Sequence, residues 1–193
     1  DMKNFRPGQK KVVESLLNKN DTGDYATGAG KSICFQIPAL LFEGVTLVIS
    51  PLISLMKDQV DSLRQLGIAA VYINSSAVSQ LYKDLQDISA GFYKIIYIAP
   101  ERLTSEYLPD SFKNLNISMV AVDEAHCLSQ WGHDFRPSYR NILNFSNSFA
   151  FKPIISAFTA TATPEVKTDI INLLGLKQPN VFVTGLIDQI YIF

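Results

Sequence analysis

The segment ATGAGKS, residues 26–32, leads directly into the apolar run ICFQIPALLF, residues 33–42. Glycines let the backbone curl so that its N–H groups point at phosphate oxygens, and the start of the following helix adds partial positive charge. Lys31 is placed to reach the β and γ phosphates of a nucleotide, and the Ser32 hydroxyl to ligate magnesium. The segment therefore predicts a phosphate-binding loop at the start of a buried helix. The loop residues expected to line this site are Thr27, Gly28, Ala29, Gly30, Lys31 and Ser32.

Two departures from the usual pattern accompany this loop. Tyr25 stands five residues before Gly30, where the strict pattern has glycine. The preceding segment NDTGDY, residues 20–25, is polar, although the strand that enters a phosphate loop is normally buried and apolar. This strand is therefore either short and exposed or altered. The alternative interpretation is a glycine-rich helix start with a surface lysine, which GAGKS in front of an apolar helix disfavours.

Six short apolar runs, rich in β-branched residues, alternate with segments of helical spacing. Because the runs do not alternate apolar with polar residues, both faces should be covered, as in a parallel sheet. The pattern predicts one α/β domain over residues 1–193, with three layers and a mostly parallel central sheet. Functional residues of such sheets lie at the carboxyl ends of the strands. The expected strands are 45–50, 69–73, 94–99, 117–122, 154–158 and 181–184, and the expected helices begin near residues 7, 31, 54, 79 and 164.

An acidic pair ends one of these strands, in the segment ISMVAVDEAH, residues 117–126. A carboxylate at a strand end can hold magnesium, and its neighbour can orient and deprotonate an attacking water. We assign Asp123 to the metal and Glu124 to the water. Such a pair is weak evidence alone, but downstream of GAGKS it predicts nucleotide hydrolysis. His126 alone would more often be a structural hydrogen-bonding residue and gains interest through its neighbours.

Composition excludes several classes of protein. Of 193 residues, 47% are hydrophobic, and 17 basic against 18 acidic side chains leave a net charge of −1, which gives no global attraction to nucleic acid or membranes. Cys34 and Cys127 are too few for a disulfide scaffold or a four-cysteine zinc site, so a reducing, intracellular setting is expected. No membrane span is expected, because no apolar run reaches about 18 residues and the apolar run 44–56 is short and contains Pro51.

Further segments make the chain resemble the first motor domain of a RecQ-family DNA helicase. The most diagnostic is AHCLSQWGHDFRPSYR, residues 125–140, which resembles the aromatic-rich loop of that family. The Asp-Glu-Ala-His segment alone fits a wider set of RNA and DNA helicases, and the loop narrows the resemblance to RecQ. The other matching segments are FRPGQ (5–9), SPLISLMKDQV (50–60), APERL (99–103) and SAFTATAT (156–163).

The resemblance implies a RecA-like fold that uses ATP and Mg²⁺ to translocate on single-stranded DNA and unwind forked duplexes in repair and recombination. Gln9 is implied to bond the adenine edge, with Arg6 nearby. Thr159 and Thr161 are implied to couple nucleotide state to DNA, since hydroxyls at this strand end can bond the acidic pair and change partners when the γ-phosphate leaves. A small-residue turn is the alternative there. The zinc module of the family lies outside this chain, so no zinc is expected.

The aromatic-rich loop also has a direct physical interpretation. Trp131, Phe135 and Tyr139 offer flat faces on which unpaired bases can stack, a contact worth about 1–3 kcal/mol per base in other systems. The alternative is that Trp131 and Phe135 anchor a long connection in the core. In this family the loop senses single-stranded DNA and relays binding to the adjacent ATP site. The residues assigned to DNA contact or coupling are His126, Trp131, His133, Phe135 and Arg136, with Lys57 and Arg102 as phosphate contacts.

Several parts of such a helicase are expected to lie outside this chain. Helicases of this type close two RecA-like domains around ATP, and the second supplies an arginine of a kind worth about 10³–10⁵ in rate. That second domain and the zinc-binding, winged-helix and C-terminal accessory domains have no counterpart here. We therefore expect residues 1–193 to bind ATP weakly, hydrolyse it poorly and not unwind DNA. The tail GLIDQIYIF, residues 185–193, departs from the family's usual sequence and is assigned no role.

Three other functions compete with this interpretation. An RNA helicase of the DEAD or DEAH type is disfavoured by QWGHDFRPSY, residues 130–139. A non-catalytic nucleic-acid-binding module is favoured by the polar segment 20–25 but opposed by the intact Lys31, Ser32 and acidic pair. A kinase with the same phosphate loop would have no use for the aromatic loop. The expected location is the cytoplasm or nucleoid of a bacterium, or the nucleus of a eukaryote.

Overall fold

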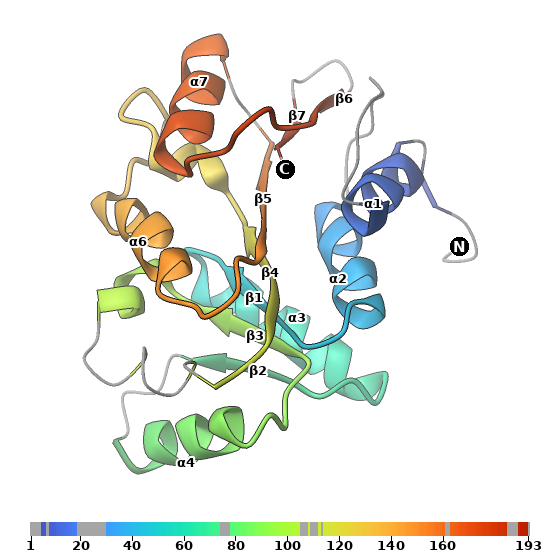
Figure 1. Cartoon of the computed structure of the whole chain (residues 1–193), viewed down its shortest axis with the longest axis vertical. Coiled ribbons are helices and arrows are strands. Elements are labelled where there is room, and N and C mark those ends of the chain that lie inside the picture. The colour runs from blue at the N-terminus through green and yellow to red at the C-terminus, as the bar shows by residue number, and fades with distance from the viewer. Residues whose placement is uncertain are drawn as a thin grey trace.

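A seven-stranded sheet forms the centre of the molecule, and helices cover both of its faces (Figure 1). The order of the strands is β2-β3-β1-β4-β5-β7-β6. The three-layer α/β architecture predicted from the alternation of apolar runs and helical segments is confirmed. The computed structural model describes residues 5–6, 8–18, 30–73, 78–104, 108, 112, 114–160, 163–184 and 189–192.

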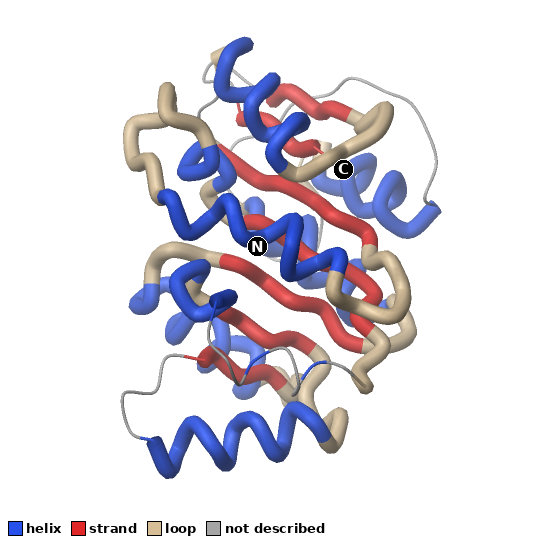
Figure 2. Tube along the Cα trace, turned by 60° about the vertical axis from the view of Figure 1, so that its left-hand side comes forward, coloured by secondary structure: helices blue, strands red, loops and turns tan. Residues whose placement is uncertain are grey.

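The first five strands are parallel to one another, and a short antiparallel hairpin extends the sheet beyond β5 (Figure 2). All six predicted strands are present, with ends within one residue of those expected. Strand β7 was not predicted, and it pairs antiparallel with both β5 and β6. The strands are β1 (Val45–Ile49), β2 (Ala70–Ile73), β3 (Ile95–Ile98), β4 (Ile117–Val122), β5 (Ile154–Thr159), β6 (Val181–Thr184) and β7 (Gln189–Ile192).

The helices divide between the two faces of the sheet (Figure 1). One face carries α1 (Gln9–Asn18), α2 (Lys31–Leu41) and α3 (Ile53–Gln65), and the other carries α4 (Val78–Ser89), α6 (Ile142–Asn147) and α7 (Pro164–Leu173). Five of these begin within two residues of the predicted positions, and Pro7 itself lies outside the described residues. Among the described residues, short 3₁₀ turns follow two strand ends, η1 (Pro100–Thr104) after β3 and η2 (Ala125–Leu128) after β4, and a third, η3 (Pro137–Asn141), directly precedes α6.

The central strands are apolar on both sides because each side meets a layer of helices. In β1, Leu47 and Ile49 pack with residues of α4, α6 and α7, whereas Val48 packs with residues of α1, α2 and α3. All five residues of β1 are buried. The continuous apolar runs that identified the strands are therefore a direct consequence of two cores on one sheet.

Packing of α2 against β5 fixes the start of that helix over the sheet. The rings of Phe35 and Phe158 lie 5.2 Å apart at an interplanar angle of 60°, and both side chains are fully buried. Because α2 begins at Lys31, this contact sets where the lysine stands relative to the carboxyl ends of the strands. In the part of the chain that the structure describes, no helix is both long and apolar enough to cross a bilayer.

Replacing Phe35 by alanine should lower the free energy of unfolding by about 3–5 kcal/mol, because it opens a cavity between α2 and β5. Urea denaturation followed by circular dichroism measures this change. Phe92→Ala is the matched control, since that ring is 70% exposed and its loss should cost about 0.5 kcal/mol or less. Equal losses in the two variants would contradict the packing described here.

Candidate active site

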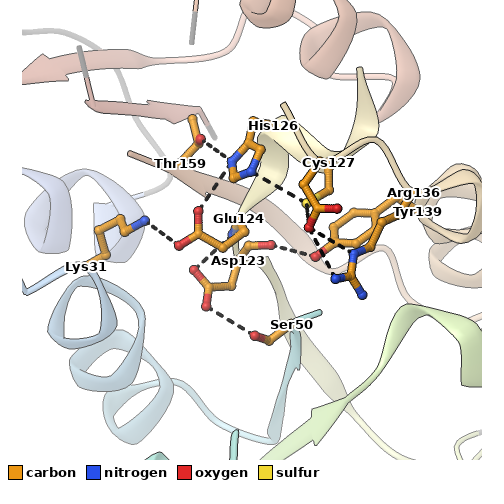
Figure 3. A network of polar contacts seen from close by, with 10 residues as sticks. Lys31, Ser50, Asp123, Glu124, His126, Cys127, Arg136, Tyr139 and Thr159 are labelled. Atoms are coloured by element: carbon orange, nitrogen blue, oxygen red, sulfur yellow. Dashed lines mark hydrogen bonds and ion pairs between the residues drawn. The ribbon is translucent and has the colours of Figure 1, made fainter. Parts of the chain in front are cut away.

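A lysine and a glutamate from distant parts of the chain meet at the carboxyl edge of the sheet (Figure 3). Lys31 is the first residue of α2, and Glu124 directly follows β4. The Lys31 Nζ lies 2.9 Å from the Glu124 Oε1, and their side chains are only 17% and 21% exposed. The pair therefore joins the two segments, 93 residues apart, that the sequence assigned to phosphate binding and water activation.

The residue before Lys31 has a conformation that favours glycine. Gly30 has φ +111°, in the left-handed region, and a Cβ there would clash with the side-chain amide of Gln9. The Gln9 Nε2 donates to the Gly30 carbonyl at 3.0 Å, and its Oε1 accepts from the Arg6 backbone N–H at 2.8 Å. Gln9 thus joins the FRPGQ segment to Gly30 at the start of α2, while its bond to adenine stays a prediction. The predicted loop residues Thr27, Gly28 and Ala29 lie outside the described residues.

Asp123 is held in a buried position at the end of β4. Its backbone N–H donates to the Ile49 carbonyl at 2.8 Å, and its carbonyl accepts from the Tyr139 hydroxyl at 2.9 Å. The Ser50 hydroxyl donates to its Oδ2 at 3.3 Å, and the Glu124 N–H to its Oδ1 at 3.0 Å. Burial, followed by the charge of Glu124, raises the pKa of Asp123 to about 6 against the opposing effects of the Lys31 charge and of its hydrogen bonds.

Glu124 has a backbone conformation that non-glycine residues rarely adopt, with φ +47° and ψ +48°. Its Oε2 lies 3.3 Å from the Nδ1 of His126, while its other oxygen faces Lys31. Burial by itself would raise the pKa of Glu124, but hydrogen bonds from His126 and Lys31 outweigh burial and lower the pKa to about 2. The carboxylate is therefore ionised at neutral pH, and both of its oxygens can accept hydrogen bonds.

His126 connects this carboxylate to β5 and to the aromatic-rich loop. Its Nδ1 lies 3.0 Å from the Thr159 Oγ1, and its ring stacks on that of His133 with centroids 4.0 Å apart and planes at 18°. Among the assigned coupling residues, His126 thus contacts both His133 and Thr159. Thr159 reaches Glu124 through the histidine. Thr161 lies outside the described residues.

The three aromatic residues of the loop have different environments. The Trp131 side chain is 77% exposed, so it is not a core anchor. Phe135 is half-buried, with the Arg140 guanidinium 5.3 Å from its ring centroid. Tyr139 is fully buried and bonds Asp123. The prediction that Tyr139 offers a face to unpaired bases is therefore wrong, because the core covers its ring and its hydroxyl supports the acidic pair.

The basic residues assigned to DNA also differ in their surroundings. Arg136 is paired with Asp134 at 3.2 Å and with Glu101 at 3.8 Å, and it donates to the Pro51 carbonyl at 3.3 Å. Its guanidinium therefore ties the loop to the segments that follow β1 and β3. Lys57 is exposed on α3, and Arg102 is half-buried in η1.

The donor chemistry at the Lys31–Glu124 pair suits magnesium. Ser32 follows Lys31 at the start of α2, and the buried Asp123 carboxylate follows β4; hydroxyl and carboxylate oxygens are hard donors that Mg²⁺ prefers. No group of three or more His, Cys, Asp or Glu side chains in the described ranges could hold a metal. Proteins commonly bind Mg²⁺ through one or two carboxylates plus phosphate oxygens and water.

Comparison with known proteins identifies the family. Residues 6–169 match the model described as DEAD/DEAH box helicase. The chain is 52% identical over 184 residues to the ATP-dependent DNA helicase RecQ of Bacillus subtilis (strain 168), covering 94% of this chain and 31% of that protein. It is 46% identical over 181 residues to the protein of the same name from Pasteurella multocida (strain Pm70), covering 93% of this chain and 28% of that protein. The chain thus spans less than a third of these relatives.

Solved structures share the fold. The helicase domain of Hef from Pyrococcus furiosus superposes with a TM-score of 0.66 at 20% identity, over 93% of this chain and 38% of that one. A hypothetical ATP-dependent RNA helicase from Sulfolobus tokodaii gives a TM-score of 0.66 at 21% identity, over 92% and 52% of the two chains. The expected RecA-like architecture is confirmed. The chain belongs to the DEAD/DEAH box helicase family, and the resemblance to RecQ helicases recognised from its motifs is confirmed.

Two supporting residues of this site were not predicted from the sequence. Ser50 bonds the Asp123 carboxylate, and Tyr139 bonds the Asp123 carbonyl. Ser50 directly follows β1, the neighbour of β4 in the sheet, so its place at a strand end was an available signal. Nothing local in the sequence distinguishes Tyr139 from Trp131 and Phe135 in the same loop.

Ser50→Ala should raise the pKa of Asp123 above about 6, because it removes a donor that stabilises the ionised carboxylate. Carboxyl-carbon NMR titration in magnesium-free buffer measures this pKa. Ser138→Ala is the control, since that hydroxyl donates to Glu101 instead.

The raised pKa of Asp123 also makes stability depend on pH. Because the folded pKa exceeds the ordinary value of 3.8, the stability contributed by Asp123 falls as the pH rises from about 4 to about 6. A wild-type Asp123 that titrates near 4 would contradict the assignment.

Proposed function

We propose that residues 1–193 are the first RecA-like domain of an ATP-dependent DNA helicase of RecQ type. The observation that carries the proposal is the convergence of Lys31, Glu124 and His126 at one edge of the sheet. There the His126 ring also stacks on His133 of the aromatic-rich loop. The two bacterial relatives, at 52% and 46% identity over the domain, are named ATP-dependent DNA helicases. Their names support the same activity for the whole protein of which this chain is a part.

In this proposal the residues around Lys31 bind and hydrolyse ATP. Lys31 exchanges its contact with Glu124 for the β and γ phosphates, and Gln9, with Arg6 nearby, bonds the adenine. Ser32 and Asp123 hold Mg²⁺, which, when bound, neutralises charge that develops on the transferring phosphate. Glu124, released from the lysine, orients the attacking water and accepts its proton.

The aromatic-rich loop supplies the connection to DNA. Trp131 presents an exposed indole on which an unpaired base can stack. His133, in the same loop, stacks on His126, which contacts both Glu124 and Thr159. Movement of the loop when it binds single-stranded DNA is therefore passed through His126 to Glu124, the residue proposed to activate water. Further residues proposed to contact DNA are Phe135, Arg136, Lys57 and Arg102. Thr161 is proposed to act with Thr159 in coupling nucleotide state to DNA.

The proposed activity needs a second RecA-like domain, which closes over ATP and supplies an arginine. The chain spans 31% and 28% of the two bacterial relatives, which leaves room for that domain and for accessory domains. We therefore expect residues 1–193 alone to hydrolyse ATP poorly and not to unwind DNA. The proposed partners are single-stranded and forked DNA together with the second domain, and a DNA substrate implies an intracellular location.

Two alternatives have weaker support. An RNA helicase is suggested by the name of the Sulfolobus tokodaii structure, but likeness at 21% identity carries the fold alone. A non-catalytic nucleic-acid-binding module would not need Lys31, Asp123 and Glu124 together, whereas all three are present and grouped. The polar segment 20–25 that favoured such a module lies outside the described residues.

Lys31→Ala in the full-length protein should abolish ATP-driven unwinding of a forked duplex and leave single-strand binding within about twofold, because the charge that faces the β and γ phosphates is lost. Lys10→Ala is the matched control, since Lys10 is 69% exposed and pairs with Glu14 one turn along α1. Strand separation and fluorescence anisotropy of labelled DNA measure the two activities.

Wild-type ATPase activity should be stimulated by single-stranded DNA and much less by RNA of the same sequence. Unwinding that survives Lys31→Ala would refute the catalytic assignment. Stimulation by RNA that equals or exceeds that by DNA would instead favour the RNA helicase.

A further inference from the structure

A buried serine at the base of the aromatic-rich loop has a hydrogen-bonding role that no motif explains. Ser129 directly follows η2 and is fully buried. Its hydroxyl accepts from the Trp131 backbone N–H at 3.1 Å and donates to the Asp169 Oδ2 at 2.5 Å. Its carbonyl accepts from the Gly132 N–H at 3.0 Å. One residue therefore fixes the main chain on both sides of the exposed tryptophan.

Asp169 determines the direction of the serine hydroxyl. A hydroxyl has one proton and two lone pairs, so donation to Asp169 leaves its lone pairs for the Trp131 N–H. A bond to a carboxylate is shorter and stronger than one between neutral groups. Asp169 lies in the second half of α7, where the helix dipole does not favour negative charge. The hydrogen bond from Ser129 therefore stabilises this carboxylate, which the dipole of its own helix does not.

The close packing of this turn agrees with a fixed geometry. A Cβ added to Gly132 would clash with the His126 carbonyl oxygen, so the main chain that follows Trp131 lies directly on the segment that carries His126. The Trp131 side chain is nevertheless 77% exposed. The loop therefore presents a solvent-accessible indole from a rigid base, which lowers the entropy lost when a base stacks on it.

Strand β5 and helix α7, which follow one another in the chain, contact the loop at two points. Thr159 at the end of β5 contacts His126 at 3.0 Å, and α7, the next helix, contacts Ser129 through Asp169. Figure 1 shows α7 beside the segment that leaves β4. A displacement of the segment from β5 to α7 when the γ-phosphate leaves would therefore move both the histidine and the base of Trp131.

We infer that Ser129 and Asp169 are positioning residues that hold the main chain of Trp131 and connect α7 to the DNA-sensing loop. The inference rests on the proposed function, because it assigns a consequence to the loop's contact with DNA. The positioning itself can be measured without DNA, since Trp131 is the one tryptophan among the 193 residues and intrinsic fluorescence reports on it alone.

The first experiment measures time-resolved fluorescence anisotropy of Trp131 in the 193-residue chain. Ser129→Ala and Asp169→Ala should both increase the amplitude of fast indole motion, and Asp169→Asn should have a smaller effect because its amide oxygen still accepts. Thr168→Ala is the matched control, since that exposed hydroxyl bonds the Pro164 carbonyl within α7 and lies next to Asp169 in the sequence. Alanine favours helix, so Asp169→Ala does not weaken α7. Unchanged indole motion in both alanine variants would overturn the inference.

The second experiment uses the full-length protein. Ser129→Ala and Asp169→Ala should raise the single-stranded DNA concentration for half-maximal ATPase stimulation by about five- to tenfold, the equivalent of one hydrogen bond. The KM for ATP and the rate without DNA should stay within about twofold of wild type. The double variant should be no worse than either single variant, because the two residues act through one contact. Losses that add in the double variant, or that fall on ATP binding instead, would also overturn the inference.

Trp131→Ala separates this inference from the proposed function. If Trp131→Ala leaves DNA stimulation intact, the proposed role of the loop in DNA sensing fails. If Trp131→Ala abolishes stimulation while the Ser129 and Asp169 variants do not weaken it, the loop senses DNA and the positioning inference alone fails.

Discussion

The contact between Lys31 and Glu124 is the interaction on which the arrangement of this site depends. Both side chains are mostly shielded from water, so each charge would be costly without the other. The pair brings together the start of α2 and the end of β4, which no local interaction places side by side. It also keeps Glu124 ionised and aimed at the position where the lysine would meet phosphate. Exchange of this partner for a nucleotide is therefore the step that would free the carboxylate to act on water.

The rest of the fold supports that contact from both faces of the sheet. The Phe35–Phe158 contact sets the start of α2, while Ser50 and Tyr139 hold Asp123 from the neighbouring strand end and from the loop. Glu124 has a left-handed backbone that costs about 1–3 kcal/mol in comparable cases. Strain of this size persists only where surrounding contacts determine the conformation, and Lys31 and His126 provide them here.

The sequence alone predicted the fold well, because strands buried on both faces are continuous apolar runs and GAGKS is a local motif. It predicted that Lys31, Asp123 and Glu124 would converge, since strand ends share one edge. It did not predict β7, because an antiparallel strand added to β5 depends on a pairing partner and not on local pattern. Tyr139 was misassigned for a similar reason: burial is set by tertiary packing. The link from Ser129 to Asp169 spans 40 residues and leaves no trace in either local sequence.

The most direct test of the account is calorimetric titration of the 193-residue chain with a non-hydrolysable ATP analogue and Mg²⁺, with the GTP analogue as control. If Gln9 and Lys31 form a working nucleotide site, the adenine compound binds and the guanine compound binds at least about tenfold more weakly, a difference of about 1.4 kcal/mol. Lys31→Ala should remove the heat of binding. A sample shown to be folded by circular dichroism that binds neither compound, or both equally, would contradict the account.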